Sequence, residues 1–143
     1  MSVTLLGPTP ASRLRLPLFA HGVAAGFPSP ADDHRDAALS LDQLVNAQAA
    51  HTFLLRAQGD SMQDAGIYDG DILVVDRAVR ALPGDVIIAC IDNEFTVKTL
   101  TYEAGLPVLM PANPKFPPLR LQQTDALEVW GVVTHSLHKH RFR

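Results

Sequence analysis

The sequence contains little cysteine, little charge and no long apolar run. Its single cysteine, Cys90, excludes an internal disulfide framework and a zinc site built from several cysteines. Charged residues make up 19% of the 143 residues and the formal net charge is -3, which argues against attachment to nucleic acid through clustered positive charge. No apolar stretch approaches the roughly 20 residues of a membrane span, and prolines and arginines interrupt the apolar N-terminal residues that a secretory signal would need. We therefore expect a cytoplasmic protein without membrane contact.

Hydrophobic residues make up 47% of the chain, which is enough to build a packed core in one domain of ordinary size. Residues 1–38 are rich in proline and glycine, a composition that favours an extended arm. The same stretch carries leucine and phenylalanine side chains, which need a surface to cover them. We predict an extended N-terminal arm over residues 1–38 and a compact β domain over residues 39–143.

Short elements are predicted along the domain. Ser40 and Gln43 have the spacing of a capping box and predict a short helix over 41–49. Asp92 and Asn93 tolerate the positive φ of a tight hairpin turn. Apolar alternation bounded by turn residues predicts strands over 52–58, 72–76, 85–91, 94–100, 106–110 and 126–134. Strands without long intervening helices indicate a mainly β protein with a folded-over antiparallel sheet or a small barrel.

The segment Gly59-Asp60-Ser61-Met62 follows the first predicted strand and precedes a possible helical turn. Backbone N–H groups at a helix start are unpaired, so a serine hydroxyl beside them combines a nucleophile with the beginnings of an oxyanion hole. Ser61 can equally be a helix N-cap. The tetrapeptide alone leaves both interpretations open.

A second candidate is Lys98, which strand alternation places on the same face as Glu94, Thr96 and Leu100. Such a lysine usually faces solvent. If apolar neighbours cover it, its charged form is disfavoured, and the neutral amine can take a proton from a serine. A further cluster, His135, His138 and His140, can ligate a metal but is more simply a polar, basic tail, and no metal or other cofactor is expected.

Several motifs together resemble the self-cleaving LexA/UmuD family of Ser–Lys peptidases. They are Gly59-Asp60-Ser61-Met62, Gly66-Ile67, Asp69-Gly70-Asp71, Val74-Val75-Asp76, Gly84-Asp85 and Glu94-Phe95-Thr96-Val97-Lys98. Leu16-Pro17-Leu18-Phe19, the 26–31 segment and Trp130-Gly131-Val132-Val133 are similar to the UmuD branch in particular. The resemblance implies the folded-over antiparallel β fold that this family shares with signal peptidase.

The resemblance also implies roles for individual residues. Ser61 would be the nucleophile and Lys98 the general base, with the oxyanion held by main-chain N–H groups at Asp60 and Ser61. The scissile bond would join Ala25 to Gly26, leaving the 118 residues from Gly26 to Arg143. We expect the intact arm to lie mostly away from Ser61 until a RecA–single-stranded DNA filament stimulates cleavage. The trimmed homodimer would then serve a UmuC-like subunit of an error-prone translesion DNA polymerase during the SOS response.

Three alternatives stay open. The chain can be a non-catalytic dimeric binding module that regulates a polymerase, or a LexA-like regulator without a DNA-binding domain. It can also be a general protease related to signal peptidase, although no membrane anchor is evident. Only 25 residues precede Gly26, too few for a helix-turn-helix domain, so sequence-specific DNA binding is not expected.

Overall fold

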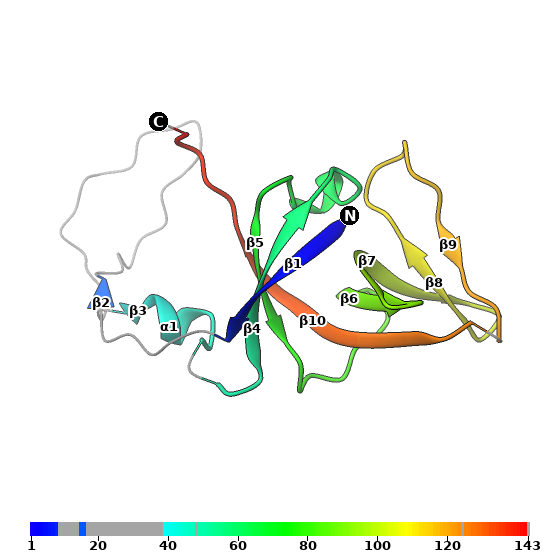
Figure 1. The fold of residues 1–143 in the computed structure, drawn as a ribbon, viewed down its shortest axis with the longest axis horizontal. Helices are drawn as coiled ribbons and strands as arrows, with labels where there is room; N and C mark the ends of the chain where they lie inside the picture. The colour runs from blue at the N-terminus through cyan, green and yellow to red at the C-terminus, as the bar shows by residue number, and fades with distance from the viewer. Residues whose placement is uncertain (9–14, 17–38, 48, 124, 143) are drawn as a thin grey trace, which may run out of the picture.

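The computed structural model describes residues 1–8, 15–16, 39–47, 49–123 and 125–142 (Figure 1). The predicted cleavage site, Ala25 and Gly26, lies outside these residues. The described elements are β1 (Ser2–Pro8), β2 (Arg15–Leu16), β3 (Leu39–Ser40), α1 (Leu41–Leu44), β4 (Thr52–Gln58), the 3-10 turn η1 (Gln63–Ala65), β5 (Ile72–Asp76), β6 (Val86–Ile91), β7 (Glu94–Glu103), β8 (Leu106–Met110), β9 (Leu119–Arg120) and β10 (Leu127–Leu137).

The strands confirm the predicted mainly β, antiparallel architecture. Among the described residues, eight strands form one sheet in the order β1-β4-β5-β10-β6-β7-β8-β9, and β2 pairs with β3 separately. The bounds of β4, β5 and β8 agree with prediction, whereas β6 begins one residue later and β7 and β10 continue further. No strand was predicted at the positions of β1, β2, β3 and β9.

Helix α1 is shorter than predicted. The capping box is present: the Ser40 hydroxyl accepts hydrogen bonds from Asp42 N and Gln43 N, and the Gln43 side chain accepts from Ser40 N. The helix nevertheless ends at Leu44, because Val45 leaves the helical region and Asn46 takes a positive φ of 55°. Helix α1 contains no buried residue, so little tertiary packing is available to extend it.

Strand β10 folds the sheet over on itself. Its first half pairs with β6 and its second half with β5, and Val132 pairs with residues of both. The register shifts near Gly131, where a Cβ atom would lie 2.5 Å from Cγ1 of Val75 and 3.2 Å from the Asp76 carbonyl oxygen. Gly131 therefore allows β5 to approach β10 closely at the point where the sheet folds over. Figure 1 shows β10 running from the β6–β9 part of the sheet to β5.

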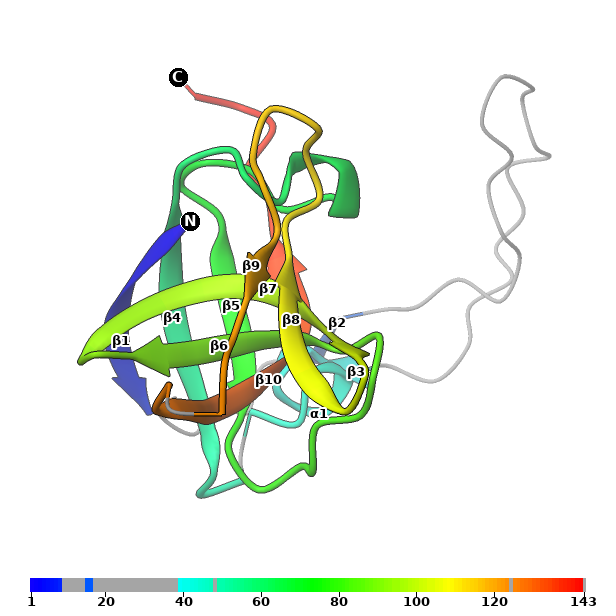
Figure 2. The same cartoon turned by 90° about the vertical axis from the view of Figure 1, so that its right-hand side faces the viewer.

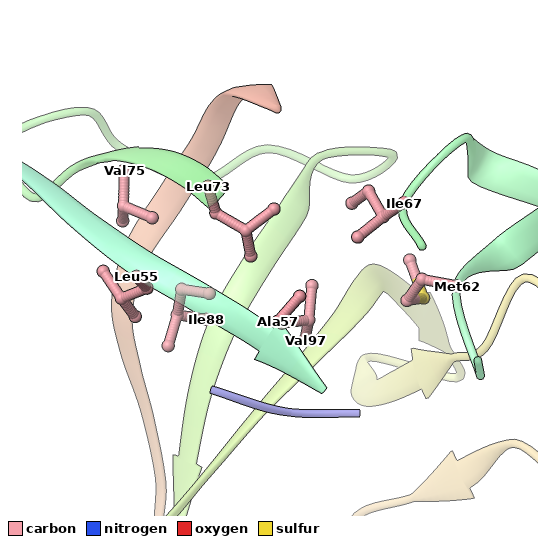
Figure 3. Packing of buried hydrophobic residues seen from close by; sticks show 8 residues of the cluster. All are labelled: Leu55, Ala57, Met62, Ile67, Leu73, Val75, Ile88 and Val97. Atoms are coloured by element: carbon pink, nitrogen blue, oxygen red, sulfur yellow. The ribbon is translucent and has the colours of Figure 1, made fainter. Parts of the chain in front are cut away.

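Among the residues that the structure describes, the fold encloses two apolar clusters. The larger one joins β4, β5, β6 and β7 with the segment after β4 (Figure 3), and its buried members are Leu55, Ala57, Met62, Ile67, Leu73, Val75, Ile88 and Val97. The second contains Ile87, Ala89, Leu100, Leu109, Leu121 and Val132. Each large side chain buried in this way stabilises the fold by roughly 1.5–3 kcal/mol. Strand β7 contributes to both clusters, so its position is fixed from both faces.

The folded sheet brings β1 next to β7. Strand β1 pairs with β4 and also contacts β7 (Figure 2). The backbone N–H of Val97 in β7 donates to the Met1 carbonyl oxygen at 3.0 Å. Residues that lie nearly a hundred positions apart in the sequence therefore meet at this edge, beside the segment that contains Ser61.

Candidate active site

Ser61 lies in a tight segment between β4 and η1. Gly59 turns the chain at the end of β4 with φ +100°, a conformation that side chains disfavour. Met62 and Ile67 then anchor the segment in the larger apolar cluster. The N-cap position of η1 is Met62 and carries no side-chain cap hydrogen bond. The alternative interpretation of Ser61 as an N-cap is therefore wrong, and its hydroxyl has other partners.

The loop between β8 and β9 holds the Ser61 segment from the other side. Ala112 N donates to the Ser61 carbonyl oxygen at 2.8 Å, and Asp64 N donates to the Ala112 carbonyl oxygen at 2.7 Å. Asn113 Nδ2 donates to the Asp60 carbonyl oxygen at 2.9 Å. The sequence predicted none of these contacts, because residues 111–118 form a proline-rich run that is typical only of a turn between strands. An asparagine within that run was the one available signal.

The structure brings Ser61 and Lys98 together. Nζ of Lys98, on β7, donates a hydrogen bond of 3.0 Å to Oγ of Ser61. Ser61 is 1% exposed, and Lys98 is partly buried. The two side chains thus meet in a shielded position, where hydrogen bonds between polar groups are stronger than in water.

Lys98 has two further acceptors beside Ser61. Its Nζ lies 3.3 Å from Oγ1 of Thr96 and 3.1 Å from the Val97 carbonyl oxygen. An ammonium group has three N–H donors and no acceptor, so three acceptors satisfy the protonated form completely. A base at this position has to be the neutral amine, which has a lone pair in place of one of these N–H donors.

Met1 lies against the same serine. Its α-amino group donates to Ser61 Oγ at 2.9 Å, and its carbonyl oxygen accepts from Thr96 Oγ1 at 2.9 Å and from Val97 N. Burial, together with the hydrogen bond and charge of Lys98, lowers the pKa of the Met1 amine from 8.0 to about 5. Met1, the first residue of the predicted arm, therefore lies at Ser61. Residues 9–14 and 17–38 of that arm lie outside the described residues, so the expectation that the arm lies mostly away from Ser61 stays a prediction.

A cleft of about 570 Å³ opens beside Lys98. Met1, Thr96 and Lys98 line it on the side of Ser61's partners, and Ile91, Phe95 and Leu119 give it apolar surface. Lys98 lines this cleft and reaches Ser61 through its hydrogen bond.

The histidine cluster does not form a ligand set. His138 Nδ1 bonds to the buried carboxylate of Asp71, and His135 Nδ1 to the neighbouring hydroxyl of Thr134. His138 and His140 share only an edge-to-face ring contact. Over the described ranges, no group of three histidine, cysteine, aspartate or glutamate residues is arranged to hold a metal. No helix in the described parts of the chain is long and apolar enough to cross a membrane.

Comparison with known proteins relates this geometry to a family. Residues 17–134, which include Ser61 and Lys98, match the family described as Peptidase S24-like. Protein MucA of Salmonella typhimurium is 42% identical over 142 residues, which cover 98% of this chain and 97% of MucA. Protein ImpA of the same organism is 46% identical over 125 residues, covering 87% of this chain and 85% of ImpA.

A repressor is also similar to the chain. The LexA repressor of Azoarcus sp. (strain BH72) is 42% identical over 124 residues, which cover 86% of this chain but 60% of the repressor. Both branches named in the sequence analysis are therefore represented. MucA and ImpA are relatives that the chain covers over most of their length.

Proposed function

The chain belongs to the S24-like peptidase family and is a UmuD-type SOS mutagenesis protein, and from this premise we propose that it cleaves its own arm with a Ser61–Lys98 dyad. The single observation that supports this most strongly is the 3.0 Å hydrogen bond between Lys98 Nζ and Ser61 Oγ. A nucleophile and a base within hydrogen-bonding reach are the minimum that covalent catalysis requires.

The proposed reaction has two steps. Neutral Lys98 takes the proton of Ser61, and Oγ attacks the carbonyl carbon of Ala25 in the docked arm. The resulting oxyanion accepts hydrogen bonds from main-chain N–H groups at Asp60 and Ser61. Lys98 then passes its proton to the departing amine of Gly26, which leaves an ester between Ala25 and Ser61. Water hydrolyses the ester, with Lys98 again acting as the base.

The contacts of Ser61 provide a reason for latency. A serine hydroxyl has two acceptor lone pairs, and Ser61 Oγ accepts from both Lys98 and Met1. Neither contact removes the serine proton, and Met1 occupies the position that a substrate has to enter. We propose that the arm segment around Ala25 replaces Met1 when cleavage occurs, and that a RecA–single-stranded DNA filament favours this exchange.

The trimmed chain, in this proposal, works in the cytoplasm as a homodimer that joins a UmuC-like translesion polymerase subunit. Similarity to MucA and ImpA over most of their length supports this role in preference to that of a LexA-like regulator. The net charge of -3 agrees with an accessory protein that does not itself bind a specific DNA sequence.

The test is incubation of the full-length protein with activated RecA filament, followed by mass spectrometry. The proposal predicts a fragment from Gly26 to Arg143, and its absence from reactions of folded Ser61→Ala and Lys98→Ala variants. A chain that stays intact beside a cleaved control substrate of the filament would support the non-catalytic binding module. Cleavage of unrelated peptides added in trans would instead support a general protease.

A further inference from the structure

Asn113, in the loop between β8 and β9, is a buried polar residue outside the proposed dyad. It is 9% exposed, and both ends of its side-chain amide are occupied. Its Nδ2 donates to the Asp60 carbonyl oxygen at 2.9 Å, and its Oδ1 accepts from Lys115 N at 3.0 Å. The second contact shapes the loop that contains Asn113, whereas the first reaches 53 residues back to the segment of the nucleophile.

The contact with Asp60 constrains a particular peptide group. A trans peptide is planar, and its C=O and N–H point in opposite directions. Holding the Asp60 carbonyl toward Asn113 therefore turns the N–H of Ser61 away from Asn113. The next peptide group is held from the same loop, because Ala112 N donates to the Ser61 carbonyl oxygen. The loop thus sets the orientation of the backbone on both sides of the nucleophile.

We propose that Asn113 is a positioning residue for self-cleavage, which aims the backbone N–H of Ser61 at the oxyanion. The inference rests on the proposed function, in which that N–H is one of the oxyanion donors. A donor stabilises the transition state most when its direction is fixed before charge develops. A free peptide group would have to be ordered during the reaction, whereas the Asn113 amide fixes it in the folded protein.

The variant Asn113→Asp tests this role with little change in shape. It keeps the acceptor for Lys115 N and loses the Nδ2 donor to Asp60. Removing a direct oxyanion donor costs on the order of 10²–10³ in rate. Loss of a residue that only orients the donor should therefore cost about 10–100-fold in the rate of spontaneous self-cleavage, measured without filament at alkaline pH, where a lysine base is neutral more often. The loss should persist where the rate no longer rises with pH, because there the base is already neutral and the added carboxylate cannot act by favouring its protonated form. Gln123→Ala, which removes an exposed amide from a neighbouring loop, is the matched control and should keep the wild-type rate.

The amide resonance of Ser61 gives a second readout that requires no cleavage. With Lys98→Ala in both proteins, so that neither cleaves, Asn113→Asp should shift this resonance near neutral pH while distant amides stay in place. An Asn113→Asp protein that is folded, cleaves within two-fold of wild type and keeps the Ser61 resonance overturns the inference. A rate loss that only follows a lowered melting temperature also overturns it. A wild-type protein that is never cleaved, or a Ser61→Ala protein that is cleaved, would contradict the proposed function instead. The Ser61 resonance would then still decide whether Asn113 orients this peptide group.

Discussion

The α-amino group of Met1 lies 2.9 Å from Oγ of Ser61, so the start of the sequence occupies the position beside the proposed nucleophile. Strand β1 supports this contact by pairing with β4 along its length. Under the proposed function, the arm segment that contains the expected cleavage site has to reach the same position. Met1 would then have to leave Ser61 before cleavage.

Removal of residues 1–8 should therefore speed spontaneous self-cleavage at alkaline pH, by several-fold, because Ser61 no longer has to exchange Met1 for the substrate. The rate is measured by gel or mass spectrometry on chains that begin at residue 9. A second variant keeps β1 and adds two glycines before Met1, which removes the free amine from Ser61, and it should also be faster. Equal or slower cleavage by both variants, with melting temperatures near wild type, would show that β1 does not restrain the reaction.

The Met1 amine should titrate far below an ordinary amino terminus. Its pKa is lowered to about 5 in the folded chain from 8.0, first by burial and then by Lys98. Between pH 5 and pH 8 the Met1 amine is protonated when it is undocked and neutral when it is docked. Docking of Met1 is therefore strongest above pH 8 and weakens as the pH falls toward 5. The amide resonance of Val97, whose N–H donates to Met1, should follow a midpoint near 5. A midpoint near 8 would mean that the amine is solvated.

Gly131→Ala should destabilise the fold by about 1–3 kcal/mol, the usual cost of overpacking. The added Cβ would lie 2.5 Å from Cγ1 of Val75, a buried side chain with no room to move, and 3.2 Å from a backbone oxygen. Urea unfolding measures the loss, and Ser136→Ala, at an exposed position on the same strand, should unfold like wild type. Unchanged stability of the Gly131→Ala variant would mean that β10 does not require its close approach to β5.

Local sequence patterns predicted the strands whose contacts are mainly regular pairing with neighbouring strands. The three strands with correct bounds, β4, β5 and β8, have clear alternation between turn residues. The pair Ser61 and Lys98 could be proposed because each lies in a short motif of its own, although the motifs alone left other interpretations open. Only the resemblance of these motifs to a known family indicated that Ser61 and Lys98 act together.

The remaining features depend on contacts between distant parts of the chain. Residues 2–8 include glycine and proline and indicated an extended arm, yet pairing with β4 makes them a strand. Asn113 and Ala112 indicated only a turn, because nothing local shows that this loop lies against the Ser61 segment. Helix α1 ends earlier than predicted because Asn46 leaves the helical region. The helix also has no buried face whose packing would stabilise a longer helix.

The central claim is that a neutral Lys98 activates Ser61, and the pH dependence of spontaneous self-cleavage tests it most directly. A lysine side chain in water holds its proton up to about pH 10.4, so the wild-type rate should rise steadily between about pH 7 and 10. Lys98→Arg keeps a positive charge but cannot act as a base, and it should lose on the order of 10²–10⁴ in rate. A wild-type rate that is flat over this range, or a folded Lys98→Arg protein that cleaves like wild type, would contradict the account.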